Sequence, residues 1–160
     1  MSETLNRRKM MGVAVSAATA ATVLSNSAAS EVKTKVTTYT YKKVGSLEIK
    51  ADVYRADDDI LRPVLVWIHG GALIVGHRAN VSGRVQKRML DAGYAIVSID
   101  YRLAPETKLP GIIEDIEDAF KWIREDGPAL FHANADRIAV MGGSAGGCLT
   151  LITGFRIRPR

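Results

Sequence analysis

Three runs of apolar residues, separated by helical patterns, constrain the fold of this chain more than any other feature. The runs are VLVWIHGG at 64–71, YAIVSIDY at 94–101 and RIAVMG at 137–142. Continuous apolar runs of this length are typical of strands that are buried on both faces of a parallel sheet. Because helical patterns alternate with these strands, the sequence predicts an α/β fold with right-handed crossovers.

The helices and the N-terminal strands follow from hydrophobic periodicity. Residues 81–92 and 111–126 carry apolar residues at helical spacing, and the second segment places its acids on the opposite face. A third helix is expected to begin near Ala145. Near the N-terminus, residues 36–44 and 47–54 are rich in β-branched and aromatic residues and are separated by a Gly-Ser pair, which predicts an antiparallel hairpin.

Ser144 lies in GGSAGG at 142–147, between the third apolar run and the third helix. A tight strand–turn–helix elbow with small residues on both sides displays a nucleophilic serine above a sheet. The same pattern also suits a serine that caps a helix. HGGA at 69–72 follows a buried strand, and its glycines allow backbone N–H groups to point at a developing oxyanion. A plain strand-end loop is the alternative for this second segment.

Three motifs together resemble those of the hormone-sensitive-lipase-like esterases of the α/β-hydrolase superfamily. They are HGGA (69–72), DYRLAPE (100–106) and GGSAGG (142–147), and they occur in the family's order. The resemblance covers roughly residues 35–154. It implies an α/β-hydrolase fold, in which an N-terminal antiparallel hairpin precedes parallel strands with crossover helices. It also implies esterase or lipase chemistry that needs no cofactor and no metal.

The resemblance assigns roles to the small residues of two motifs. Ser144 is the expected nucleophile of an acyl-enzyme mechanism. The backbone N–H groups of Gly70, Gly71 or Ala72, together with that of Ala145, would form the oxyanion hole. The family has a third glycine where this chain has Ala72. A backbone donor survives that change, while the added methyl group narrows the acyl pocket.

Other polar residues of the motifs are expected to support the site without reacting. His69 is interpreted as a structural hydrogen-bonding residue beside its glycines. Asp100 and Arg102 are expected to pair with each other and to brace the loops beneath the site. His77 and His132 are interpreted as loop histidines without a catalytic role.

The sequence after Ala145 contains no Asp, Glu or His, whereas the resemblance places the triad acid and histidine after the serine. We therefore expect an α/β-hydrolase domain that is truncated after the nucleophile elbow and has little or no activity. The strand that ends at Met141 is expected to become an unpaired, aggregation-prone sheet edge. Cys148 is interpreted as a small core residue, and the Asp57–Asp59 run as a solvated turn without a metal.

The first 29 residues predict an export signal ahead of a partial hydrolase domain at 30–160. Arg7 and Arg8 precede a modest apolar stretch and then small residues, with cleavage expected after Ala29. The paired arginines resemble a twin-arginine signal, which predicts a periplasmic or extracellular protein. A disordered or helical N-terminal arm is the alternative. The apolar stretch at 12–24 is too short for a stable membrane span.

The net charge of +5 does not indicate a nucleic-acid partner. Basic residues near the two ends of the chain account for all of it, so the body is neutral and shows no basic stripe. The expected partner is a small-molecule ester or an acylated carbohydrate, including acetyl or feruloyl groups on plant polysaccharides. The oligomeric state is not readable. The alternative function is a non-catalytic remnant or scaffold that keeps the α/β-hydrolase fold.

Overall fold

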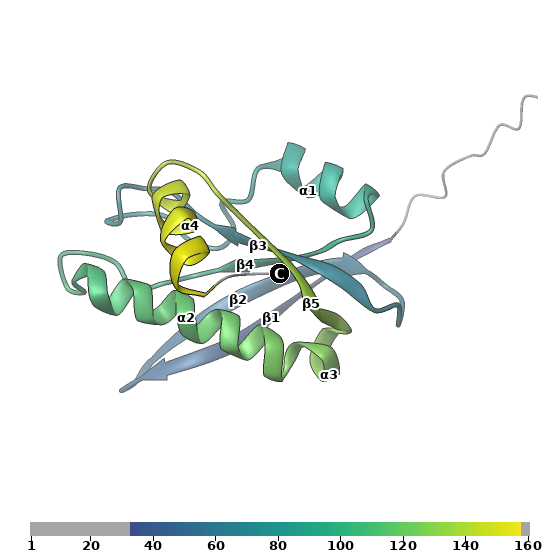
Figure 1. The fold of residues 1–160 in the computed structure, drawn as a ribbon, viewed down its shortest axis with the longest axis horizontal. Helices are drawn as coiled ribbons and strands as arrows, with labels where there is room; N and C mark the ends of the chain where they lie inside the picture. The colour runs from purple at the N-terminus through teal and green to yellow at the C-terminus, as the bar shows by residue number, and fades with distance from the viewer. Residues whose placement is uncertain (1–32, 158–160) are drawn as a thin grey trace, which may run out of the picture. The chain divides into compact units, whose positions relative to one another are not determined.

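The computed structural model describes residues 33–157, which form a mixed five-stranded sheet with helices on both faces (Figure 1). The export signal predicted at 1–29 lies outside the described residues. In chain order the elements are β1 (Thr34–Val44), β2 (Leu47–Ala56), β3 (Arg62–Ile68), α1 (Gly83–Asp91), β4 (Ala95–Ile99), α2 (Leu109–Glu125), α3 (Gly127–Phe131), β5 (Ala133–Gly142) and α4 (Ala145–Arg156).

The strand order is β1-β2-β4-β3-β5, as expected for an N-terminal hairpin followed by parallel strands. β1 pairs with β2 and β2 pairs with β4 in antiparallel fashion, whereas β3 is parallel to both β4 and β5. Gly45 provides the left-handed conformation (φ 59°) in the turn that joins β1 to β2. The predicted fold class, an α/β-hydrolase fold with this arrangement of strands, is confirmed.

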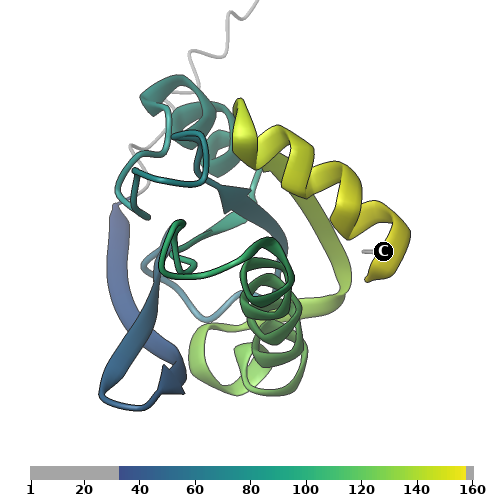
Figure 2. The same ribbon diagram turned by 90° about the vertical axis from the view of Figure 1, so that its left-hand side faces the viewer.

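Strand β3 shows why the sequence reads as a continuous apolar run. Val64, Val66 and Ile68 belong to the large core cluster that includes α2 and α4, while Leu65 and Trp67 belong to a smaller cluster with residues of α1. Successive side chains of a strand point to opposite faces, so both faces of β3 are covered. Figures 1 and 2 show α1 on the side of the sheet opposite to α2.

The apolar face of helix α2 matches the periodicity prediction, although the helix begins at Leu109, two residues earlier than expected. The prediction that its acids lie on the opposite face was wrong for Asp115, which is buried. Pro110 lies in its first turn, where the missing N–H costs no helical hydrogen bond. The sequence predicted only a loop between this helix and the next strand, and that was wrong. The short helix α3 fills this segment, and Pro128 again lies in the first turn.

Strand β5 corrects the expectation of a third strand buried on both faces. Within residues 33–157 it lies at the end of the strand order and pairs with β3 alone. Ile138 packs into the core, but Ala139 and Met141 are exposed because no helix covers the opposite face of this strand among the described residues. The expectation that the strand ending near Met141 lies at a sheet edge holds for the described residues.

Candidate active site

Ser144 occupies a sharp turn between β5 and α4. Its backbone has φ 54° and ψ −121°, a conformation that is rare and costly for a residue with a side chain. The side chain is exposed and makes no capping hydrogen bond to the helix, although the residue holds the N-cap position. The alternative that Ser144 serves as a helix cap therefore lacks the side-chain hydrogen bond that defines such a cap. The turn instead leaves the Ser144 side chain exposed at the end of β5.

Two glycines make this turn sterically feasible. A Cβ on Gly146 would lie 2.1 Å from the carbonyl oxygen of Ile68, and a Cβ on Gly142 would lie 2.4 Å from the carbonyl oxygen of Gly146. Both obstacles are main-chain atoms, which cannot rotate away. At Gly143, by contrast, a Cβ would meet nothing within 4 Å. The strict requirement for glycine is therefore confined to the positions two residues before and two residues after the serine.

The glycine loop, which comprises residues 69–78, follows β3 and lies against the serine turn. The two segments lie close together because Ile68 at the end of β3 pairs with Gly142 at the end of β5. A Cβ on Gly70 would lie 2.7 Å from the Gly143 carbonyl oxygen and 3.3 Å from the Ser144 Cβ. Only a residue without a side chain allows this approach of the two segments.

The glycine loop turns tightly immediately after this contact. Gly71 has φ 113°, and its carbonyl oxygen accepts hydrogen bonds from the N–H groups of Ile74 and Val75, both at 3.0 Å. Ala72 and Leu73 also have positive φ values, 53° and 65°. The family's third glycine thus corresponds to a left-handed position, which explains the preference for glycine where this chain has Ala72.

The four expected oxyanion donors lie in these two segments. Within residues 33–157, the N–H groups of Gly70, Gly71, Ala72 and Ala145 donate to no protein acceptor. Ala145 is the first residue of α4, where backbone N–H groups have no partner in the helix and the helix dipole favours negative charge. Free donors beside an exposed serine can stabilise an oxyanion that forms on an ester carbonyl.

His69 is buried beneath the glycine loop. Its Nδ1 lies 2.8 Å from the Gly70 carbonyl oxygen, and its ring stacks on Tyr101 with centroids 4.2 Å apart. The Tyr101 hydroxyl donates to the His69 carbonyl oxygen at 2.8 Å. Burial lowers the pKa of His69 and raises the pKa of Tyr101 to about 12, so both rings remain neutral near pH 7.

None of the three histidines contacts Ser144. His77 is exposed, and its backbone N–H donates to the Asn80 side chain at 2.9 Å. His132 follows α3 in a left-handed conformation, and its Nε2 lies 3.4 Å from an Asp59 carboxylate oxygen. Together with the buried position of His69, these contacts leave the serine without a histidine base among residues 33–157.

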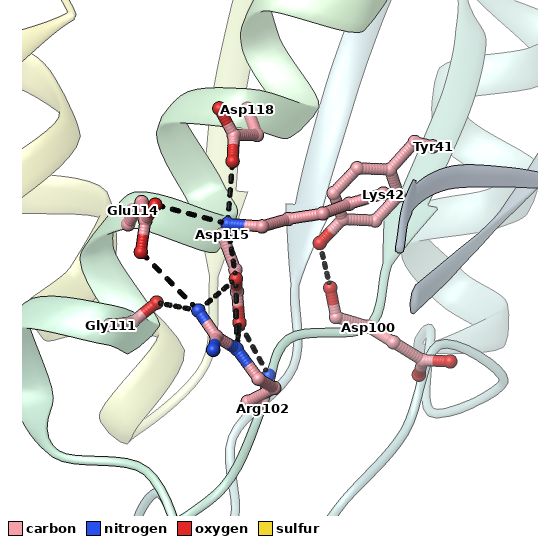
Figure 3. Close-up of polar contacts among 8 residues, drawn as sticks. All are labelled: Tyr41, Lys42, Asp100, Arg102, Gly111, Glu114, Asp115 and Asp118. Carbon is pink, nitrogen blue, oxygen red and sulfur yellow. Dashed lines mark hydrogen bonds and ion pairs between the residues drawn. The ribbon is translucent and has the colours of Figure 1, made fainter. Parts of the chain in front are cut away.

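Asp100 and Arg102 do not pair, which corrects the expectation that they brace the loops together. The Asp100 carboxylate accepts from Arg78 of the glycine loop, with Nη1 at 2.7 Å. Arg102 instead contacts Asp115 of α2, through Nε at 2.8 Å and Nη2 at 2.8 Å (Figure 3). The segment after β4 lies between the glycine loop and α2, so each of the two side chains finds a different partner.

Asp115 is a supporting residue that the sequence reasoning missed. Its side chain is fully buried and accepts from the backbone N–H of Arg102 at 3.0 Å, and Lys42 Nζ lies 2.9 Å away (Figure 3). Burial alone would raise its pKa, but the hydrogen bonds from Arg102 and Lys42 outweigh that effect and hold the pKa below its ordinary value. The sequence did contain a signal for this residue: Asp115 comes three residues after Ile112 and so lies on the apolar face of the helix.

Two further sequence interpretations have structural outcomes. Cys148 was expected in the core and is exposed, because its position in α4 faces away from the sheet. In the Asp57–Asp59 turn, Asp58 pairs with Arg55 and Arg62. No group of three or more potential ligands is placed to hold a metal ion within the part of the chain that the structure describes. In that same part, no helix has the length and apolar content of a membrane-crossing segment.

The sheet order and the strand–turn–helix arrangement define an α/β-hydrolase, and comparisons with known proteins identify its family. Residues 51–158 match the BD-FAE family. Residues of this chain are 38% identical over 101 positions to Esterase LipI of Mycobacterium tuberculosis (strain ATCC 25618 / H37Rv), covering 63% of this chain and 31% of LipI. They are 35% identical over 138 positions to the non-reducing polyketide synthase Preu3 of Preussia isomera, covering 80% of this chain and 6% of Preu3.

A solved structure described as a bacterial heroin esterase superposes with a TM-score of 0.69 and 31% identity, over 78% of this chain and 40% of that protein. The chain thus spans less than half the length of each of these relatives. The chain belongs to the BD-FAE family and has the α/β-hydrolase fold of the hormone-sensitive-lipase-like esterases. Two of these relatives, LipI and the bacterial heroin esterase, carry the name esterase.

Proposed function

We propose that Ser144 is the nucleophile of a carboxylic ester hydrolase that works through an acyl-enzyme. The Ser144 Oγ attacks the ester carbonyl carbon, the carbonyl oxygen becomes an oxyanion, and the alcohol leaves with the serine proton. Water then attacks the acyl group and releases the acid. The free N–H groups of Gly70, Gly71 or Ala72 and of Ala145 donate to the oxyanion. No cofactor or metal takes part in these steps.

One observation carries this proposal: Ser144 has a strained backbone with positive φ, and its side chain makes no hydrogen bond to the helix that would offset the strain. The conformation costs about 1–3 kcal/mol for a non-glycine residue. The hydroxyl makes no capping bond, and glycines stand where any side chain would collide with β3. The strained turn exposes one hydroxyl beside free N–H donors. This arrangement favours a role for Ser144 as a nucleophile over a purely structural role in the turn.

The same geometry favours a second candidate, a non-catalytic protein with this fold. Activation of a serine requires a general base within hydrogen-bonding reach, and none of the three histidines contacts Ser144. The family resemblance places the acid and histidine after the serine. If Ser144 is the nucleophile, its acylation without a base should run only at the residual level that an oxyanion hole provides, about 10³ to 10⁴ over water. The second candidate shows no acylation of Ser144 at all.

The test is stoichiometric acylation of the 160-residue chain by p-nitrophenyl acetate, a small activated ester. Nitrophenolate release and intact mass report the acetyl group, and peptide mapping locates it. Ser144→Ala should abolish the adduct. Cys148→Ser is the control, because the exposed thiol one helical turn away is a competing nucleophile. An adduct that survives in Ser144→Ala and disappears in Cys148→Ser would overturn the serine assignment, and no adduct at all would favour the non-catalytic candidate.

We also propose that the protein is exported and acts on small-molecule or carbohydrate-linked esters outside the cytoplasm. Arg7 and Arg8, ahead of the small-residue stretch that ends at Ala29, support a twin-arginine route. N-terminal sequencing of secreted material should give Ser30 as the first residue. The double variant R7K/R8K should accumulate as uncleaved precursor. An intact Met1 terminus on material recovered from outside the cytoplasm would contradict the signal-peptide proposal.

A further inference from the structure

Arg78, at the end of the glycine loop, makes more charged contacts with the sheet than any neighbouring residue of that loop. Its backbone N–H donates to Asp100 Oδ1 at 2.7 Å, and its Nη1 donates to Asp100 Oδ2 at 2.7 Å. Its Nε donates to Asp52 Oδ1 at 2.9 Å. A planar guanidinium is suited to bridging two carboxylates with directed hydrogen bonds. Arg78 therefore connects the glycine loop to β2, through Asp52, and to the residue that follows β4, Asp100.

The two carboxylates are themselves fixed. The Asp100 N–H donates to the Lys50 carbonyl oxygen at 2.8 Å, and its carbonyl oxygen accepts from the Tyr41 hydroxyl at 2.6 Å (Figure 3). Asp52, in the middle of β2, accepts from the Thr38 hydroxyl at 2.6 Å. Because both partners of Arg78 are tied to the antiparallel hairpin, the contact anchors the glycine loop to a rigid part of the sheet.

The glycine loop needs such anchors because its backbone is strained. Ala72 and Leu73 are consecutive non-glycine residues with positive φ, and such residues persist only when surrounding contacts hold them. Two other contacts tie the loop to the segment after β4. The Ala104 N–H donates to the Leu73 carbonyl oxygen, and the Tyr101 hydroxyl donates to the His69 carbonyl oxygen, both at 2.8 Å. Arg78 supplies a third contact, and this one is charged.

We infer that Arg78 is a positioning residue, which holds the N–H donors of the glycine loop in place by bridging Asp100 and Asp52. The inference rests on the proposed function, because those donors matter only if an oxyanion forms at Ser144. Arg78 does not touch the reacting atoms. Its removal should misplace the donors, and misplacement by about 1 Å can slow a reaction by about 100-fold. We expect Arg78→Ala to slow acylation of Ser144 by about 10- to 100-fold.

The experiment measures the acylation rate of the 160-residue chain as a function of p-nitrophenyl acetate concentration. Arg78→Ala should lower the maximal acylation rate and leave the half-saturating concentration within about twofold, because the donors act on the transition state. Arg62→Ala is the matched control. Arg62 also bonds to an aspartate, Asp58, and to a backbone oxygen, that of Gly93, but it lies at the opposite end of β3.

A rescue distinguishes positioning from general stability. Glycine has no penalty in the left-handed region, so Ala72→Gly in the Arg78→Ala background should recover part of the lost rate by making the native loop conformation less strained. Arg78→Lys should recover less, since an ammonium group is not shaped to bridge both carboxylates. Equal losses in Arg78→Ala and Arg62→Ala, without rescue, would overturn the inference.

Amide hydrogen exchange tests the inference independently of the proposed function. The N–H groups of Ile74, Val75 and Ala104 are bonded only while the loop keeps its shape. In Arg78→Ala they should exchange at least tenfold faster, while amides of β3 and β4 keep their rates. Unchanged exchange at these three residues would refute the role of Arg78. If wild type is not acylated but the three amides respond as expected, the proposed function fails and the positioning role remains.

Discussion

Replacing Gly146 by alanine is expected to destabilise the chain by about 3 kcal/mol, the upper end of the usual cost of overpacking. The new Cβ would lie 2.1 Å from the Ile68 carbonyl oxygen and 2.6 Å from the His69 carbonyl oxygen. Close carbon–oxygen contacts in proteins begin near about 3.3 Å. Helix α4 would therefore have to move by roughly 1 Å away from the end of β3, and the serine turn would move with it.

Gly154→Ala provides a matched control within the same helix. A Cβ at Gly154 has nothing within 4 Å, and replacing glycine by alanine inside a helix stabilises it by about 0.5–1 kcal/mol. Two chemically identical substitutions in α4 should thus change the free energy of unfolding in opposite directions. Gly143→Ala is the control for the turn itself, since that position is also open.

The assay is urea unfolding followed by far-ultraviolet circular dichroism, with the size of each variant checked by sedimentation. Gly146→Ala should shift the midpoint to lower urea, while Gly154→Ala shifts it slightly higher. If the free energy of unfolding of Gly146→Ala lies within about 1 kcal/mol of the wild-type value, the close approach of α4 to β3 is not rigid. A steric requirement for glycine two residues after the serine would then be refuted.

Three further outcomes are expected. Ala72→Gly should leave the free energy of unfolding unchanged or raise it by about 0.5 kcal/mol, because relief of a left-handed φ of 53° outweighs the added backbone entropy; a loss of about 1 kcal/mol in a urea titration would contradict this. Asp115→Asn should cost about 3 kcal/mol, since it leaves Arg102 without its buried counter-charge. The folded-state pKa of this carboxyl is depressed, so its stabilisation is present above about pH 4, its unfolded value, and is lost as pH falls through the folded pKa; urea titrations at pH 7 and pH 3 should show a smaller pH dependence in the variant. Phe155→Lys should reduce self-association in sedimentation velocity, because this side chain is 84% exposed on α4, whereas Leu47→Lys at the tip of the hairpin should have little effect.

Local patterns predicted those parts of the fold whose cause is local. The buried strands β3 and β4 and the long helix α2 follow from runs and periodicities that need no knowledge of the tertiary arrangement. The position of β5 at a sheet edge is different. Its sequence resembles that of β3, but Ala139 and Met141 are exposed because burial depends on which helices cover the strand. Composition alone carries no information on that point.

The polar partners around the site were not predictable for a similar reason. Asp100 and Arg102 are two residues apart in one motif, and their opposite charges suggested a pair. Their true partners, Arg78 and Asp115, come from a loop and a helix that the fold brings to the two sides of this segment. The one hint in the sequence was Asp115 itself. An acid on the buried face of an amphipathic helix requires a cationic partner, and that requirement indicates a tertiary contact.

The main-chain part of the candidate site is formed by two neighbouring strands, β3 and β5, and the segments that follow them. Ser144 and the free N–H groups beside it are placed by β3, β5 and the loops that follow them, because Ile68 and Gly142 are in register and the glycines allow contact. This main-chain geometry exposes the Ser144 hydroxyl beside free N–H donors, as the proposed nucleophile and oxyanion hole require. His69 does not supply the base for the proposed proton transfer, because its Nδ1 contacts the Gly70 carbonyl oxygen and its ring stacks on Tyr101. Within residues 33–157 the proposed donors are present and no histidine contacts Ser144, so the acylation rate of this chain tests the proposed donors in the absence of a histidine base.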